Sequence, residues 1–302
     1  MKKLFAVFAV FGLLLAACGD DGDDTLAATS EEVAPDTGEA EVSEAHPVAI
    51  ISMSATATEM LFAIGAGDQV IAVDSFSYFP AEAPVTDLSA FDISPEAIAA
   101  YEPDLVVLSG PAGQEELESL GIPVLVQGAA VVFDDVYAQI AELGALTGQV
   151  DGAADLVASM RSDIEEIVAS IPASDDERTY YHELDDTLYS VTSATFIGEV
   201  YKLAGLRNIA DPADADGASF GYPQLSQEFI LDADPDFIFL ADTQCCGQTA
   251  DVIAERDGWS DLSAVQNGNV VEVDADVASR WGPRVVDYLR VVVDSLSAAS
   301  VS

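Results

Sequence analysis

The stretch ISPEAIAAYEPDLVVL (Ile93–Leu108) has a second copy, LSQEFILDADPDFIFL (Leu225–Leu240), which aligns with it without a gap at an offset of 132 residues. Each copy begins with Ser-x-Glu, predicts a short helix, and continues through Pro-Asp into an apolar run typical of a buried strand. Ser94 and Ser226 are expected to cap the two helices. A helix–strand unit that occurs twice predicts two lobes of similar construction.

Short apolar runs alternate with helical segments around the first copy. TATE (Thr56–Glu59) fits a capping box and predicts a helix that ends near Gly65. The same alternation restarts after residue 172, and strands that alternate with helices predict a mainly parallel sheet in each lobe. The strand-like runs of the first lobe are Val48–Ser52, Val70–Val73, Leu105–Leu108 and Val124–Val126.

One long helix is predicted between the lobes. Apolar residues recur at near-helical spacing over residues 149–171, and Pro172 ends the pattern. The predicted fold class is therefore α/β, with two Rossmann-like lobes of mainly parallel sheets, residues 46–148 and residues 172–302, joined by this helix. A single stiff connector is expected to limit how far the lobes can open.

The composition is strongly acidic, because 54 Asp and Glu residues stand against 10 Lys and Arg residues and give a formal net charge of −44. A field of this sign repels nucleic acid and anionic membrane surfaces, and no nucleic-acid partner is expected. We interpret the charge as a solvated acidic surface suited to a salty medium. A role in binding cations is the alternative.

The N-terminus has the pattern of a secreted, lipid-anchored protein. A cationic start, MKK, precedes the apolar run Leu4–Leu15, which is too short to remain as a membrane-spanning helix. The small residues before Cys18 resemble a bacterial lipobox, which implies a signal peptide over residues 1–17 and a lipid on Cys18; a plain secretory signal is the alternative. Residues 18–45 are acidic and poor in large apolar groups, which predicts a disordered tether. We expect an extracytoplasmic protein anchored to the cell membrane.

The segment IISMSATATEMLFAIGAGDQVIAV, which starts at Ile50, resembles the opening of the substrate-binding proteins of ABC importers for ferric siderophores, haem and cobalamin. YEPDLVVLSG, GIPVLVQG, LTGQ, WSDLSAVQNGNVVEVD and RWGPR continue the resemblance in order along the chain. It implies two lobes bridged by one helix, with a metal chelate held in the cleft between them. It also implies a monomeric binding protein that is not an enzyme, needs no cofactor, and serves an ABC permease and its ATPase. The favoured chelate is a ferric siderophore or a cobalamin-type ligand; a receptor that feeds a signalling system, or haem binding on the same scaffold, is the alternative.

The resemblance also implies one exposed Glu in each lobe that docks on arginines of the permease. The matching positions are Glu96 and Glu228, which occupy the same place in the two copies of the repeat. Compensation of the helix dipole by an acidic first turn is the alternative role.

The loops that follow the predicted strands are rich in aromatic residues. In α/β sheets, ligands bind beyond the carboxyl ends of the strands, so these loops are expected to line the cleft. Rigid aromatic walls suit a large planar or semi-apolar ligand. The predicted ligand-binding residues are Phe76, Tyr78, Phe79, Phe220, Tyr222, Arg280 and Trp281.

The stretch SRWGPR (Ser279–Arg284) places two arginines beside a tryptophan in a chain with few cations. The resemblance puts Arg280 and Trp281 at the cleft, with a salt bridge as the alternative for Arg280. Pro283 predicts a helix start, which puts Arg284 at the positive end of a helix dipole and predicts a carboxylate partner for it. Because so few cations are available, a neutral or cationic hydroxamate-type siderophore or a corrinoid is favoured over an anionic catecholate.

Directly bound metals and hydrolase chemistry are not expected. His46 and His182 are too few for a transition-metal site, and His182 is expected to be solvated or hydrogen-bonded at a strand end. DPADADG lacks the calcium pattern, because Pro212 occupies a ligand position and the distal Glu is missing. GASFG around Ser219 matches a nucleophile elbow, but loop residues precede it and no His follows it.

Cys245 and Cys246 are adjacent in TQCCGQ. Outside the cytoplasm, two cysteines besides the lipidated one favour a disulfide, which would stiffen this loop. Free thiols or a role on a metal are the alternatives.

Overall fold

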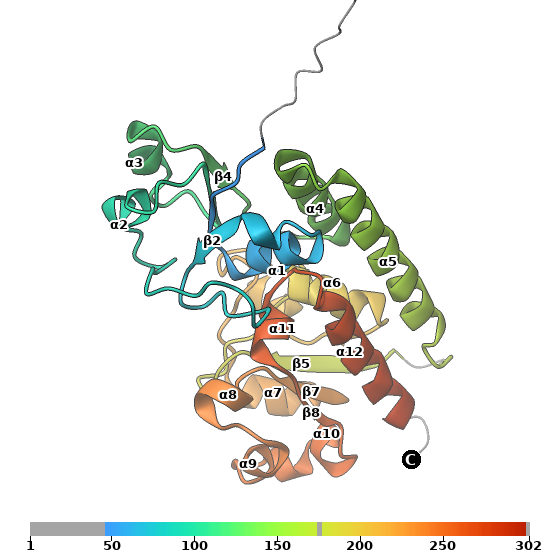
Figure 1. The fold of residues 1–302 in the computed structure, drawn as a ribbon. Helices are drawn as coiled ribbons and strands as arrows, with labels where there is room; N and C mark the ends of the chain where they lie inside the picture. Colours follow the sequence, from blue (N-terminus) through green and yellow to red (C-terminus); the bar gives the residue numbers. More distant parts are fainter. Residues whose placement is uncertain (1–45, 174–176, 300–302) are drawn as a thin grey trace, which may run out of the picture. The chain divides into compact units, whose positions relative to one another are not determined.

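The computed structural model describes residues 46–173 and 177–299 (Figure 1). The predicted signal peptide, Cys18 and the predicted tether therefore lie outside the described residues. Within the described part of the chain, no helix combines the length and the apolar character that a membrane crossing needs.

The N-terminal lobe is built on a four-stranded parallel sheet with the strand order β2-β1-β3-β4. Its central strands β1 and β3 are buried along their whole length, as expected for a parallel sheet that is covered on both faces. The strands are β1 (Ile50–Met53), β2 (Val70–Val73), β3 (Leu105–Leu108) and β4 (Val124–Val126), and the helices are α1 (Ala55–Ala63), η1 (Gly67–Gln69), α2 (Pro95–Ala99), α3 (Gln114–Ser119) and α4 (Phe133–Thr147).

The C-terminal lobe repeats this topology with the order β6-β5-β7-β8, and its strand pairs are also parallel. The strands are β5 (Thr179–Glu183), β6 (Arg207–Asn208), β7 (Phe237–Leu240) and β8 (Val270–Glu272). The helices are α6 (Phe196–Leu203), η2 (Asp211–Asp214), α7 (Gln227–Ala233), α8 (Thr243–Cys246), α9 (Ala250–Ala254), η3 (Trp259–Asp261), α10 (Ser263–Gln266), α11 (Ala275–Ser279) and α12 (Val285–Ala299). The predicted fold class of two parallel α/β lobes is confirmed.

The sequence repeat has a structural counterpart. Its two copies become α2 with β3 and α7 with β7, and each of these strands holds the third place in its sheet. Both predicted caps are present, because the Oγ of Ser94 accepts a hydrogen bond from the backbone N–H of Ala97 (3.4 Å) and the Oγ of Ser226 accepts one from that of Phe229 (3.2 Å). The two copies of the repeat therefore form the same helix and strand at equivalent positions in the two lobes.

The start of α1 differs from the prediction. The cap is Ser54, whose backbone is extended (φ −145°) and whose Oγ accepts from the N–H of Ala57 at 3.2 Å. Thr56 and Glu59 lie inside the helix and are both buried. The capping box predicted over Thr56–Glu59 is wrong, and the carboxylate of Glu59 contacts the other lobe instead.

The predicted linking helix is α5 (Val150–Ala169), which is slightly shorter than expected. It packs against α4 and α12, and Figure 1 shows α5 and α12 running beside one another. Around these helices the buried residues of both lobes form one continuous hydrophobic cluster, from Ile50 on β1 to Tyr180 on β5. The lobes are thus joined by a packed core as well as by a helix.

Candidate ligand-binding site

Loops at the carboxyl ends of the two sheets form the candidate site. Because all named strand pairs are parallel, the loops after the strands of each sheet gather at one edge of it. The two sets of loops touch: the hydroxyl of Tyr78, after β2, donates a hydrogen bond to Asp276 on α11, after β8. The candidate site therefore lies where these two edges approach each other.

The N-terminal lobe presents two exposed aromatic rings, Phe76 and Phe91, which we call its aromatic wall. Phe76 is 51% exposed and Phe91 is 84% exposed, and their rings pack edge to face with centroids 5.2 Å apart. The Oγ of Ser89 accepts from the N–H groups of Phe91 and Asp92, which fixes the turn that presents the ring. Sequence reasoning missed Phe91, although it is an isolated aromatic in the polar stretch TDLSAFDISPE.

Phe220 projects from the C-terminal lobe. Its ring is 88% exposed, and its φ of 52° is in the left-handed region that a bulky residue rarely adopts. Asp214 holds the loop on both sides of this residue, because its carboxylate accepts from the N–H groups of Ser219 and Gly221, each at 2.7 Å. The carbonyl oxygens of Gly221 and Pro223 accept hydrogen bonds from backbone N–H groups of the segment that follows β5, which joins the loop to that segment. The lobe thus fixes an exposed aromatic ring at the strand ends, beside the half-exposed Tyr222.

The acidic residues of DPADADG support loops. Asp211 accepts from the N–H and the hydroxyl of Ser193 at 2.7 and 2.9 Å, and Asp216 accepts from the N–H of Ala218. In the described part of the chain, no group of three or more His, Cys, Asp or Glu side chains is arranged to hold a metal ion. These carboxylates satisfy backbone donors of the Phe220 loop and its neighbours.

Glu59 forms ion pairs that link the two lobes. It is 3% exposed, and its carboxylate accepts from Arg280 (Nη1, 3.2 Å) and from Arg284 (Nε, 2.9 Å; Nη2, 2.5 Å). The predicted carboxylate partner of Arg284 is therefore confirmed. Hydrogen bonding to Glu59 raises the pKa of Arg284 against the opposing effect of burial. Because α1 belongs to the N-terminal lobe, this buried pair spans the lobe boundary.

Arg280 has further partners within the chain. Its Nη2 donates to the carbonyl oxygen of Phe76 at 3.1 Å and to Asp276 at 2.9 Å, and its guanidinium lies 5.4 Å from the ring centroid of Tyr78. The hydrogen bond to Asp276 raises the pKa of the Tyr78 hydroxyl. The structure thus shows the salt bridge that was the alternative for Arg280. Its contact with a ligand, like that of Tyr78, stays a prediction.

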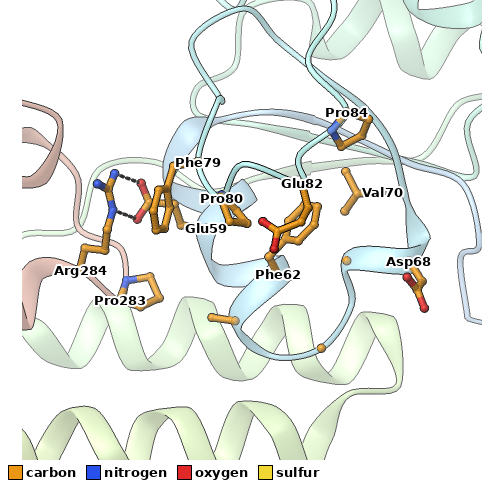
Figure 2. A pocket seen from close by; sticks show the side chains of 13 residues that line it. Glu59, Phe62, Asp68, Val70, Phe79, Pro80, Glu82, Pro84, Pro283 and Arg284 are labelled. Atoms are coloured by element: carbon orange, nitrogen blue, oxygen red, sulfur yellow. Dashed lines mark hydrogen bonds and ion pairs between the residues drawn. The ribbon is translucent and has the colours of Figure 1, made fainter.

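Trp281 and Phe79 lie apart from the Phe76–Phe91 wall. Trp281 packs against the shared core, and its indole N–H donates to the side chain of Gln139 at 2.9 Å. Phe79 lines a groove of 740 Å³ beside α1, where the guanidinium of Arg284 lies 4.0 Å from its ring centroid. Figure 2 shows Phe79 at the Glu59–Arg284 end of this groove and Asp68 at the other end. The predicted aromatic set is therefore divided among the strand-end loops, the groove beside α1 and the shared core.

A buried acidic pair lies at the strand ends of the C-terminal lobe. Glu183 closes β5 and binds the guanidinium of Arg256 through two hydrogen bonds, of 2.6 and 2.7 Å. Asp242 follows β7, is fully buried, and has no hydrogen-bond partner for either carboxylate oxygen among the described residues. Burial, together with the neighbouring Glu183, raises the pKa of Asp242 to about 7. Asp242 is thus a carboxyl group that the fold holds largely protonated below neutral pH.

The remaining predicted positions are placed as follows. Cys245 and Cys246 form a disulfide in α8, directly after Asp242. His182 is buried and hydrogen-bonded to the hydroxyl of Tyr201 at 2.7 Å, and burial lowers its pKa to about 3. Glu96 and Glu228 are exposed in the first turns of α2 and α7. A role for them at a permease stays a prediction.

Comparison with known proteins supports this architecture. The model of the family described as "Periplasmic binding protein" matches residues 50–277. The chain is 30% identical to the uncharacterised ABC transporter substrate-binding lipoprotein YvrC of Bacillus subtilis over 98% of both chains. It is 31% identical to a cobalamin-binding protein of Halobacterium salinarum, over 81% of this chain and 68% of that protein. A solved structure from an ABC-type Fe³⁺-hydroxamate transport system of Saccharomonospora viridis superposes with a TM-score of 0.65 at 26% identity, over 83% of this chain and 93% of the other. This chain belongs to the periplasmic binding protein family.

Proposed function

We propose that this protein captures a metal chelate outside the cytoplasm and delivers it to an ABC permease and its ATPase. The observation that carries the proposal is the pair of exposed aromatic walls, Phe76 with Phe91 and Phe220 with Tyr222, at the carboxyl ends of the two sheets. Large exposed rings on a rigid frame bind a bulky, partly apolar molecule through packing. Family membership supports a transport role.

A corrinoid such as cobalamin is the ligand that we favour. Several relatives carry names of cobalamin-binding or vitamin B12-binding proteins, among them those of Halobacterium salinarum and Vibrio cholerae. The charge of the site also favours a ligand of low charge. Arg256, Arg280 and Arg284 each bind a buried carboxylate, so their positive charge is already compensated. A highly anionic chelate would have to displace these partners, at a cost of several kcal/mol for each buried pair that is broken.

A ferric hydroxamate is the second candidate. The solved structure from Saccharomonospora viridis belongs to a hydroxamate transport system. A hydroxamate complex of low charge would meet the same aromatic walls and the same compensated arginines. A ferric tricatecholate is strongly anionic and haem carries two propionates, so both fit these arginines less well.

Delivery is proposed to use Glu96 and Glu228. Both side chains are exposed, and they occupy equivalent first-turn positions of α2 and α7, so each lobe offers one carboxylate in the same local setting. Anchoring through a lipid on Cys18 would keep the protein near its permease. Replacement of both glutamates by Arg should abolish uptake and leave ligand affinity unchanged, whereas normal uptake by this variant would refute the docking role.

The ligand is tested by titration of the purified chain with cyanocobalamin, a ferric trihydroxamate, a ferric tricatecholate and haemin, each followed by its visible absorbance and by calorimetry. We expect cyanocobalamin to bind most tightly and the tricatecholate to bind least tightly. Tightest binding of the tricatecholate would contradict the charge argument. A chain that binds none of the four would contradict the proposed function.

A further inference from the structure

The vicinal cysteines lie at the carboxyl end of a central strand of the C-terminal lobe. β7 ends at Leu240 and α8 begins three residues later at Thr243, with Cys245 and Cys246 bonded to each other at its end. Both residues are exposed. Figure 1 shows α8 on the same lobe as α11, the helix that carries the contact with Tyr78.

A chain of contacts places α8 close to the meeting point of the lobes. The side-chain oxygen of Gln244 on α8 accepts from the backbone N–H of Ala275 at 3.2 Å. The next residue, Asp276, binds both the hydroxyl of Tyr78 and the guanidinium of Arg280. The cysteine pair is therefore joined through one side chain to the segment that touches the N-terminal lobe.

The disulfide does not serve the packing of the lobe. Neither cysteine belongs to the hydrophobic clusters of the described residues, and the buried side of the loop is supplied by Asp242, whose carbonyl oxygen lies 3.6 Å from the Sγ of Cys245. What the bond adds to an exposed loop is a fixed pair of polarisable, apolar sulfurs without free rotation. Such a surface contacts a ligand at a small entropic cost.

We propose that the Cys245–Cys246 disulfide is a ligand contact of the C-terminal lobe, where its sulfurs pack against an apolar face of the bound chelate. This inference rests on the proposed function, because it assigns one more residue pair to the same site. It also assigns a selectivity: a chelate with a broad apolar face gains more from the sulfurs than a compact one does. A bond that only stiffened the loop would give no such difference.

The first test measures protection of the disulfide. The full chain carrying Cys18→Ser keeps Cys245 and Cys246 as its only cysteines. It is treated with a phosphine reductant with and without saturating cyanocobalamin, while the cobalamin spectrum is followed to verify that the cobalt stays oxidised. Reduction is scored by alkylation and mass. We expect bound cyanocobalamin to slow reduction at least 10-fold. Equal rates in a chain that binds cyanocobalamin would overturn the inference and leave the proposed function intact.

The second test measures affinity and selectivity. Cys245→Ala with Cys246→Ala should weaken cyanocobalamin binding at least 5-fold, and should weaken binding of a compact ferric trihydroxamate less, at an unchanged melting temperature. The matched control is Val252→Ala, which removes an exposed apolar side chain from neighbouring α9 and should leave both affinities unchanged. If the double variant unfolds, the reduced wild-type chain replaces it. Equal affinities of the oxidised and the disulfide-free protein would overturn the inference. If the unmodified chain binds no chelate, the proposed function is wrong, and the inference that rests on it is wrong as well.

Discussion

Glu59 is the residue on which the lobe boundary most depends. It is buried and carries two arginines from the other lobe, one of them through two hydrogen bonds. The need of Arg284 for a carboxylate could be predicted from Pro283, which marks a helix start. The identity of this partner could not be predicted, because Glu59 lies 225 positions away in the sequence and its neighbouring residues also fit a capping box. A pattern confined to four residues cannot report on a contact between lobes.

Glu59→Gln should lower the free energy of unfolding by ~3 kcal/mol, because it leaves the largely buried Arg284 without its carboxylate partner and leaves Arg280 with Asp276 alone. Urea unfolding followed by circular dichroism measures this loss. The control is Arg207→Ala, which breaks an exposed ion pair with Glu177 (3.1 Å) and should cost no more than ~1 kcal/mol. Equal losses of unfolding free energy in the two variants would show that the buried ion pair between the lobes stabilises the fold no more than an exposed ion pair does.

Asp242 predicts a pH dependence. Its pKa is raised from 3.8 to about 7, so between these values the folded chain holds a proton that the unfolded chain has released. The contribution of this group to stability is therefore full below about pH 4, falls as the pH rises to about 7, and is level above that. Asp242→Asn removes this titration. The unfolding free energy of the variant minus that of the wild type, measured in urea, should therefore increase from pH 4 to pH 7. A difference that is constant with pH would contradict the raised pKa.

At the scale of elements, the sequence was most informative where structure is local. The repeat predicted α2–β3 and α7–β7, and the apolar spacing predicted α5, because helix period, caps and short buried strands are written in neighbouring residues. The site was predicted only in part. Phe76 and Phe220 are exposed at the strand ends, whereas Trp281 packs on the core and Phe79 lines the groove in Figure 2. Which way a loop side chain turns depends on contacts from elsewhere in the fold.

The contact between α5 and α1 depends on a glycine. A Cβ on Gly152 would lie 2.2 Å from the carbonyl oxygen of Ile64, a distance that backbone atoms cannot relieve without moving the helix. Gly152→Ala should therefore destabilise the chain by ~2 kcal/mol through overpacking, in spite of the better helix propensity of Ala. The unfolding midpoint in urea measures this effect, and Ala154→Ser on the exposed face of α5 is the control. An unchanged midpoint for Gly152→Ala would mean that α5 can move freely on α1.

At the scale of the whole molecule, the continuous core was not visible in the sequence. The repeat and the helix predicted two lobes and a connector, but the packing of α4 and α12 on α5 joins the buried residues of both lobes into one cluster. With Glu59 and its arginines, this core holds the lobes together more firmly than a single helix would. We therefore expect small changes in lobe angle on binding, with adaptation carried by the loops at the strand ends.

The net charge of −44 predicts a response to salt. Repulsion among carboxylates opposes the folded state, and dissolved ions screen it. The melting temperature should therefore rise from low to molar salt, by similar amounts in NaCl and KCl. A flat or falling trend would contradict a destabilising surface charge, and a rise in only one of the salts would point to a specific ion instead.

We propose that the chelate binds between the aromatic walls at the strand ends. A crystal structure of the complex with cyanocobalamin would locate the ligand directly. We expect the corrin between Phe76 and Phe91 on one side and Phe220 and the cysteine pair on the other, with Glu59 still bound to Arg284. A corrin seated in the groove beside Phe62 and Phe79, or away from both sets of strand-end loops, would contradict this proposal.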